Sequence, residues 1–400
     1  MALRLHDTLS GRKKDFEPIR KGEVKIFVCG PTVYDHVHVG HARTFIFYDV
    51  LARYLQNLGF TVTFVMNLTD MDEKIFNRAN REGKPHQEIS KHYAEEFKQT
   101  LKFLNVNTVS KLESASDYLE GAILQVKAIL ENDGAYVVDG DVYFDTSKFP
   151  DYGKLSHQSP LELKLRRIEP SPEKRNQTDF LLWKKFEVDP YWESPFGKGR
   201  PGWHIEDTAI AISNLGQQYD IHGGGIELVF PHHEAEIAQA EVLTGKRPYV
   251  RYWVHTGLLK VRGRKMSKSL GNYILIKDIL EIYGANAIRL FSLSTHYRQE
   301  VDFNVLALKK AARDAELISK AWATLQRKSL GSKNFVHTIN AVEKTFYRSM
   351  NDDVNTSKAI KSVLSLAKMI NVEPDSFDEQ SISTAKSLLG KMLEILGISA

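Results

Sequence analysis

The most constraining feature of this sequence is a strand, turn, helix and strand pattern near its N-terminus. Residues 25–29 (KIFVC) form a short, mostly apolar run, and a Gly-Pro-Thr turn at 30–32 follows it. Residues 41–58 then have helical periodicity up to Gly59, and residues 61–68 are apolar and rich in β-branched side chains. Two buried strands joined by a helix form a parallel βαβ unit. The sequence therefore predicts an α/β fold with a Rossmann-like parallel sheet.

The predicted sheet is interrupted once and is followed by helices. Seven of the chain's 13 prolines fall between residues 134 and 201, which predicts a loop-rich insertion. Strand-like segments resume at 219–222 and 250–256, and from about residue 303 the apolar residues have helical spacing. We therefore predict a split catalytic domain (1–133 and 202–300), a connective insertion (134–201) and an α-helical bundle (301–400).

Composition limits the compartment and the partners. The chain has no run of 18 uncharged apolar residues and no apolar segment typical of a signal peptide, so we expect no membrane span and a cytoplasmic location. Cys29 is the single cysteine and cannot form an intrachain disulfide, in agreement with a reducing compartment. The net charge of +4 permits a polyanionic partner without requiring one.

Two short motifs could act on a nucleotide. His38-Val39-Gly40-His41 lies at the entrance to the first long helix, where free backbone N–H groups and the helix dipole favour a phosphate. Lys265-Met266-Ser267-Lys268-Ser269 follows a turn and offers two lysines for a leaving pyrophosphate. Each motif alone is also compatible with an ordinary solvent-exposed loop. The sequence contains no G-x-x-x-x-G-K-[ST] or G-x-G-x-x-G pattern, which argues against P-loop ATPases and dinucleotide oxidoreductases.

Together the two motifs resemble the paired signatures of class I aminoacyl-tRNA synthetases, and further blocks resemble the cysteinyl-tRNA synthetases of that class. These blocks are Phe27–Asp35 with Gly40–Thr44, Asn67–Ile75, Gly202–Glu206, Asp220–Gly225 and Phe230–Glu234, and a helical-domain signature lies at Met350–Thr356. The resemblance implies a ligase that uses ATP and Mg²⁺ to convert L-cysteine into cysteinyl-adenylate and transfers it to tRNA(Cys). It also implies a monomer.

The resemblance assigns expected roles to individual residues. Four of them should stabilise the transition state of adenylate formation: His38, His41, Lys265 and Lys268. The positions that match ATP-binding residues are Gly40, His41, Gly224, Lys265, Ser267 and Lys268. The positions that match the amino-acid pocket are Gly30, Thr32, Thr69 and Trp203, of which Trp203 could close over the small substrate.

The resemblance further implies a zinc ion that binds the sulfur of the substrate. Matched position by position, its ligands are Cys29, Asp207, His232 and Glu236. His232 and Glu236 are four residues apart, which places both on one face of a helix. Asp207 departs from the family, which ordinarily has a second cysteine there, although a carboxylate is an acceptable zinc ligand. We favour a variant zinc site over a site for another divalent metal or a metal-free pocket of changed specificity.

Two other functions stay open. One is a related ligase that transfers cysteine to a small amine, as in the mycothiol pathway, and the other is a catalytically idle paralogue that binds RNA. The intact motifs at 38–41 and 265–269 argue against the idle paralogue, and Asp207 is its best support. Family members usually continue into a small anticodon-binding domain that has no counterpart here, so we expect the acceptor stem and the helical bundle to supply tRNA recognition.

Overall fold

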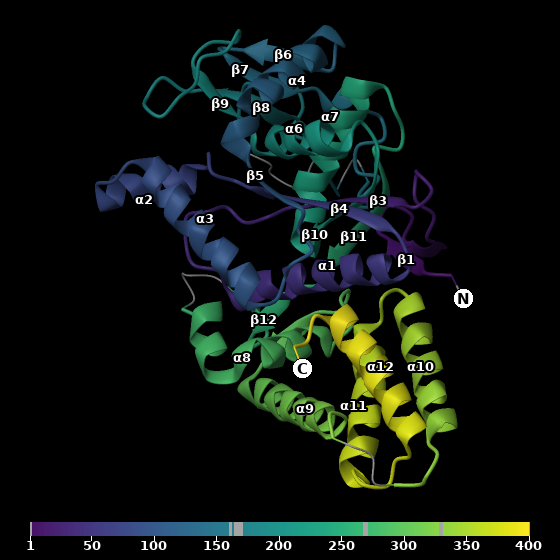
Figure 1. Cartoon of the computed structure of the whole chain (residues 1–400). Helices are drawn as coiled ribbons and strands as arrows, with labels where there is room; N and C mark the ends of the chain where they lie inside the picture. Colours follow the sequence, from purple (N-terminus) through teal and green to yellow (C-terminus); the bar gives the residue numbers. More distant parts are fainter. Residues whose placement is uncertain (1, 160–161, 164–170, 267–270, 328–330, 400) are drawn as a thin grey trace.

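The protein is built around one parallel sheet (Figure 1). The computed structural model describes residues 2–159, 162–163, 171–266, 271–327 and 331–399. Every neighbouring pair in the five-stranded central sheet is parallel. In spatial order the strands are β11 (Val250–Thr256), β10 (Tyr219–Gly225), β3 (Glu23–Val28), β4 (Thr61–Leu68) and β5 (Lys111–Ser114). The predicted Rossmann-like parallel sheet is confirmed.

Both faces of this sheet are covered, as the apolar run in β3 requires. Successive side chains of a strand point to opposite faces. Val24 and Ile26 therefore pack in the core that includes α1, whereas Phe27 packs in the core that includes α6. The helices of the first face are α1 (Val39–Asn57) and α8 (Ile276–Leu293), and those of the second are α4 (Leu119–Glu131), α6 (Trp203–Leu215) and α7 (Glu234–Thr244).

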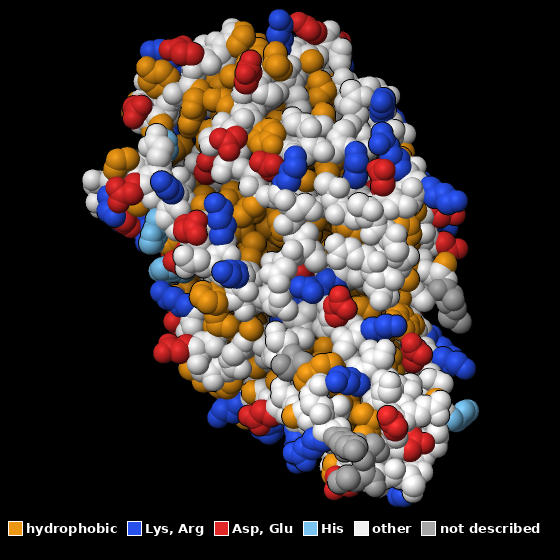
Figure 2. Space-filling view, in the orientation of Figure 1, with side chains coloured by type: hydrophobic (Ala, Val, Ile, Leu, Met, Phe, Trp, Pro, Cys, Tyr) orange, Lys and Arg blue, Asp and Glu red, His pale blue; other side chains and the backbone are white. Residues whose placement is uncertain are grey.

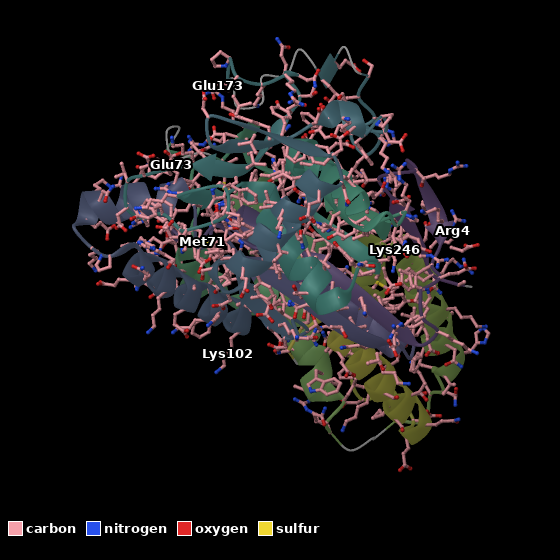
Figure 3. The ribbon with its side chains drawn as sticks, turned by 90° about the horizontal axis from the view of Figure 1, so that it is seen from above. Arg4, Met71, Glu73, Lys102, Glu173 and Lys246 are labelled. Carbon is pink, nitrogen blue, oxygen red and sulfur yellow. The ribbon has the colours of Figure 1, made fainter. Side chains whose placement is uncertain are left out.

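A smaller antiparallel sheet lies between the two halves of the parallel one in sequence. Its strands follow one another in space as they do in the chain, and Figure 1 places them above the central sheet. They are β6 (Ala135–Val138), β7 (Asp141–Phe144), β8 (Phe180–Lys185) and β9 (Gly199–Pro201). Two further helices, α2 (Glu73–Glu82) and α3 (His86–Phe103), project from one side of the molecule. In the view from above, Met71 and Glu73 lie on that side and Arg4 on the opposite side (Figure 3).

The C-terminal part is an α-helical bundle, as predicted. Its helices are α9 (Val305–Thr324), α10 (Val336–Asn351), α11 (Thr356–Val372) and α12 (Glu379–Leu396). Buried apolar residues of all four helices belong to the same core as α1 and α8. The bundle is therefore packed against α1 and α8, which separate it from the central sheet.

Two small sheets connect these parts. The N-terminal hairpin pairs β1 (Arg4–Asp7) with β2 (Arg12–Asp15) and lies beside β11. The other sheet pairs β12 (Leu259–Val261) with β13 (Arg264–Lys265) and β14 (Val301–Phe303). Because β13 ends at Lys265, this second sheet determines where the lysine motif begins.

The surface carries charges of both signs. On the face in Figure 2, acidic and basic side chains are interspersed, in keeping with the small net charge of +4. Within the described residues, the search for membrane-spanning helices found none that is long and apolar enough.

Candidate active site

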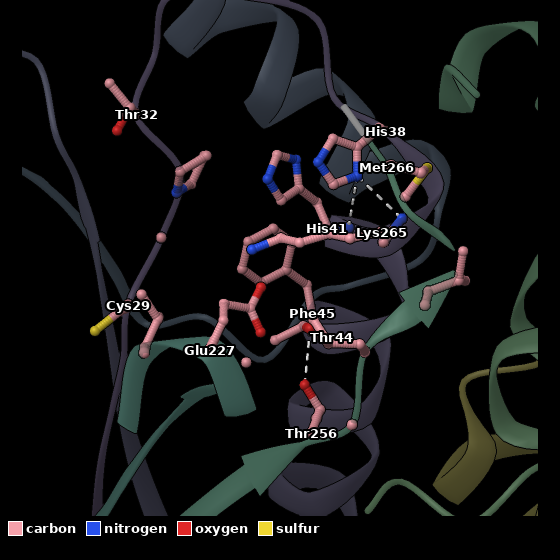
Figure 4. A pocket seen from close by; sticks show the side chains of 18 residues that line it. Cys29, Thr32, His38, His41, Thr44, Phe45, Glu227, Thr256, Lys265 and Met266 are labelled. Atoms are coloured by element: carbon pink, nitrogen blue, oxygen red, sulfur yellow. Dashed lines mark hydrogen bonds between the residues drawn. The ribbon is translucent and has the colours of Figure 1, made fainter. Parts of the chain in front are cut away.

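The candidate site lies where the parallel strands end. The carboxyl ends of β3, β4 and β10 meet at one edge of the sheet, which is where α/β proteins bind their ligands. A cavity of about 220 Å³ opens there (Figure 4). Among its lining residues are Cys29, Gly30, Thr32, His38, Gly40, His41, Glu227, Thr256, Lys265 and Met266. The structure thus brings the two sequence motifs to one cavity as far as Lys265, whereas Ser267 and Lys268 lie outside the described residues.

His38 is the N-cap of α1, and its ring orients the start of the helix. Its Nδ1 accepts hydrogen bonds from the backbone N–H groups of Gly40 (3.1 Å) and His41 (3.3 Å). Because Nδ1 accepts, the neutral ring carries its proton on Nε2, which leaves one N–H for a ligand. The His41 ring stacks on His38 with centroids 3.6 Å apart, and its Nδ1 is buried without a partner among the described residues.

Both rings are neutral at physiological pH. Burial, with a smaller contribution from the charge of Lys265, lowers the pKa of His38 to about 4. Burial also lowers the pKa of His41 well below its usual value. The pair therefore offers hydrogen bonds to a phosphate without offering cationic charge, and Lys265 supplies the positive charge at this end of the cavity.

Glycines leave the edge of the sheet free of side chains, so that a ligand can approach it. A Cβ at Gly30 would lie 1.8 Å from the carbonyl oxygen of Asn67, so no other residue fits between β3 and β4 at this level. A Cβ at Gly224 would lie 2.8 Å from the Leu228 side chain. The sequence-predicted Gly224 is not among the residues that line the nucleotide cavity, but its neighbour Gly225 is.

The other two residues predicted for the amino-acid pocket lie next to this cavity. Thr69 and Trp203 line an adjoining cavity of about 470 Å³, together with Glu206. The Trp203 ring is 42% exposed and stacks on His232 with centroids 4.1 Å apart. Trp203 therefore separates the outer cavity from the histidine behind it, a position from which it could cover a small substrate.

A fully buried cluster of metal-binding side chains lies behind Trp203. The Cys29 thiol donates a hydrogen bond to Asp207 Oδ2 (3.2 Å), and His233 Nε2 lies 3.1 Å from Cys29 Sγ. His232 Nε2 lies 3.0 Å from Asp207 Oδ2 and 3.2 Å from Glu236 Oε1. The structure thus brings together all four residues predicted as metal ligands.

The donor atoms of this cluster fit a metal ion. Those of Cys29, His232, His233 and Glu236 all lie within 4.8 Å of one another. Both carboxylate oxygens of Glu236 are buried, and neither accepts a hydrogen bond from any described residue. A buried carboxylate that accepts no hydrogen bond is costly, and a bound cation would reduce that cost. Thiolate, imidazole and carboxylate are also the ligands that Zn²⁺ takes in proteins.

Without a cation these groups oppose one another's ionisation. Burial, and then the nearby Asp207 and Glu236, raise the pKa of the Cys29 thiol well above its usual value. Burial and the charge of Asp207 also raise the pKa of Glu236. Burial lowers the pKa of His233. A divalent ion at this place would favour the deprotonated form of each group, so metal binding and proton release are linked here.

Sequence reasoning missed His233. The chain passes through an irregular segment, Val229–His233, in which Phe230 has extended backbone angles (φ −137°, ψ 130°), before α7 begins at Glu234. The consecutive residues His232 and His233 at its end are both buried and both contact the cluster. The sequence did contain a signal for this residue, because a second histidine directly follows His232 and precedes Glu236 by three positions.

Similarity to known proteins identifies the family. A family profile described as "tRNA synthetases class I (C) catalytic domain" matches residues 15–313, and one described as "DALR domain" matches residues 345–400. The cysteine–tRNA ligase of Caldicellulosiruptor saccharolyticus is 41% identical over 99% of this chain and 87% of its own. That of Aquifex aeolicus is 42% identical over 100% of this chain and 84% of its own. The chain belongs to the cysteine–tRNA ligase family.

Cysteine–tRNA ligases share their fold with other class I aminoacyl-tRNA synthetases. The Mycobacterium tuberculosis methionyl-tRNA synthetase in complex with methionyl-adenylate covers 94% of this chain and 89% of its own, with a TM-score of 0.65 and 16% identity. The Thermus thermophilus arginyl-tRNA synthetase covers 98% of this chain and 84% of its own, with a TM-score of 0.62 and 14% identity. At these identities the likeness concerns the fold alone.

Proposed function

We propose that this chain activates L-cysteine with ATP and transfers the cysteinyl group to tRNA(Cys). One observation carries the proposal. Cys29 belongs to the buried metal-binding cluster and also lines the cavity that holds His38, His41 and Lys265. A thiol held at the cluster would therefore place the rest of a small amino acid at the mouth of the nucleotide cavity.

At the nucleotide end, catalysis is electrostatic and positional. The carboxylate of the substrate attacks the α-phosphate of ATP, and pyrophosphate leaves. His38 and His41 donate hydrogen bonds to the phosphate as charge develops, and Lys265 holds the leaving group together with Ser267, Lys268 and Mg²⁺. Gly40 and Gly225 line the nucleotide cavity and allow the backbone to approach the nucleotide there. Thr69 and Trp203 border the amino acid from the adjoining cavity.

At the other end, Cys29, Asp207, His232 and Glu236 hold Zn²⁺, with His233 against the same thiol. When bound, zinc supplies a soft Lewis acid that binds a thiolate far better than a serine hydroxyl. Asp207 keeps its place in the cluster because Asn67 Nδ2 donates a hydrogen bond to its second oxygen, Oδ1 (2.7 Å). A carboxylate in place of a second thiolate makes the site harder, so we expect zinc to bind more weakly than at a site with two cysteines.

Exchange of labelled pyrophosphate into ATP, with cysteine and serine compared on metal-assayed protein, tests the proposal. We expect exchange with cysteine alone, which a chelator abolishes and added Zn²⁺ restores. An equal response to serine, or cysteine-dependent exchange by metal-free protein, would contradict the zinc-based selection. Addition of tRNA(Cys) or of an amino-sugar acceptor then separates a tRNA ligase from a ligase that acts on a small amine.

A further inference from the structure

The turn between α10 and α11 contains a buried carboxylate at the junction of the bundle and the catalytic domain. This turn belongs to the Met350–Thr356 segment, and Asp353 within it is fully buried with a left-handed φ of 63°. A non-glycine residue in that conformation is uncommon and needs local compensation. The contacts of its side chain show what holds it there.

The Asp353 carboxylate joins three parts of the chain. Oδ1 accepts hydrogen bonds from the backbone N–H of His6 (2.8 Å) and from the Tyr297 hydroxyl (2.7 Å). Oδ2 accepts one from Arg298 Nε (2.8 Å), and His296 Nε2 lies 3.5 Å away. A buried charged acceptor with three donors is a strong and geometrically specific connection. The bundle is thereby tied to β1 and to the segment His296–Gln299.

The same segment is held from its other side by α1. The Arg43 guanidinium, 2% exposed, donates hydrogen bonds to the carbonyl oxygens of Gly257, His296, Tyr297 and Gln299. The Tyr297 ring stacks on Phe47 of α1 with centroids 4.1 Å apart. The segment therefore lies between Asp353 and the helix that begins at His38.

The segment also sets the position of Lys265. The backbone N–H of Gly257 donates to the Tyr297 carbonyl oxygen (2.7 Å), and that of Val301 donates to Leu258 (2.9 Å). β14 then continues beside β12, and β12 pairs with β13, which ends at Lys265. One continuous set of contacts thus connects Asp353 with both His38–His41 and Lys265.

We propose that Asp353 is a positioning residue for adenylate formation. Through Tyr297 and Arg298 it fixes the segment His296–Gln299 and so the placement of Lys265 against the histidines of α1. This inference rests on the proposed function, because it assumes that these groups act on ATP. The bundle is also where we expect tRNA to bind. A change in how the bundle packs on the catalytic domain would therefore change the geometry of the nucleotide cavity.

Two near-isosteric variants test the role. Asp353→Asn removes the charge that pairs with Arg298, and Tyr297→Phe removes only the hydroxyl and keeps the ring on Phe47. We expect each to lower kcat of cysteine-dependent pyrophosphate exchange about tenfold, with KM for cysteine changed less than about twofold. Asp352→Asn is the matched control, because the neighbouring Asp352 carboxylate is 44% exposed and pairs with Lys13; its kcat should stay at the wild-type value.

A double-mutant cycle with Lys265→Ala separates positioning from general stability. If Asp353 acts through Lys265, Asp353→Asn should change kcat less than about twofold in the Lys265→Ala background. Additive losses, or losses that follow the melting temperature and include a raised KM for cysteine, would overturn the role. A wild-type kcat in both Asp353→Asn and Tyr297→Phe would overturn it and leave the proposed function intact. A wild-type protein without exchange would overturn both.

Discussion

The two ends of the candidate site consist of different types of residue. The metal-binding cluster consists of side chains that are at most 7% exposed, and it contains one thiol, two carboxylates and two histidines. The nucleotide cavity is open to solvent and is lined by glycines, threonines and the start of a helix, with Lys265 exposed at its edge. Among the residues that the structure describes, only Cys29 belongs to both.

This difference indicates a division of tasks. The cluster is buried, and its chemistry suits the selection of one side-chain type by a single strong bond. The cavity suits a larger substrate that must enter, react and leave, and there the protein contributes neutral donors and a cation at the end of a small sheet. If the two ends act separately, a substitution in the cluster should leave nucleotide binding unchanged. A substitution in the nucleotide cavity should leave zinc content unchanged.

The largest effect is expected from Cys29→Ser. Losing the only thiolate of the cluster should lower kcat/KM for cysteine by about 10³-fold or more, because zinc affinity and substrate orientation are lost together. Binding of a non-hydrolysable ATP analogue, measured by calorimetry, should stay within about threefold of wild type. Loss of nucleotide binding in a folded variant would show that the two ends are not separate.

Lys265→Ala should affect the opposite end. We expect kcat of pyrophosphate exchange to fall about 10²-fold, since one preorganised charge on the leaving group is lost. Zinc content and KM for cysteine should not change. Lys260→Ala is the control, because this lysine of β12 pairs with Glu300 on the surface and does not line the cavity. A matching loss of zinc in the Lys265 variant would contradict the division.

Substitutions at position 207 test which residues of the cluster bind zinc. Asp207→Asn should weaken zinc binding about 10- to 100-fold, because the amide is a poorer ligand, and Asp207→Cys should strengthen it. Competition with a chromophoric chelator measures both. A tight wild-type site that neither variant alters would show that Asp207 is not a ligand and that His233 completes the set.

The nucleotide end should also differ from the cluster in how its stability depends on pH. The pKa of His38 is about 4 in the folded protein, below the value of about 6.5 in an unfolded chain. The unfolded state therefore binds the extra proton first, and stability falls as pH decreases from about 6.5 to about 4, by on the order of 3 kcal/mol for this residue.

Urea unfolding of His38→Gln at several pH values isolates that contribution. The variant should lose stability less steeply over this range than wild type, whereas His337→Gln, at an exposed position of α10, should not differ from wild type. Identical slopes for wild type and His38→Gln would show that the partial burial of the ring does not lower its pKa.

Local patterns were sufficient to predict the sheet and the bundle, whereas the four candidate ligands came from the resemblance to a known family. The apolar run of β3 and the helical spacing after residue 303 are properties of neighbouring residues, and the ligands followed from matched motifs. The inclusion of His233 depends on the irregular backbone of Val229–His233, which residue spacing does not reveal. The role of Asp353 depends on contacts with residues as distant in sequence as His6. The spacing of residues along the chain does not predict such long-range contacts.

The substitution at position 207 also changes how the site responds to oxidants. Two thiolates on one zinc ion can be oxidised to a disulfide, which expels the metal. This chain has a single cysteine, so that reaction has no second partner within the molecule. Oxidation of Cys29 would have to proceed through a sulfenic acid or an external thiol, and the side chain is only 7% exposed to either. If the cluster holds zinc, a ligand set with Asp207 would exchange some metal affinity for resistance to oxidative loss of the metal.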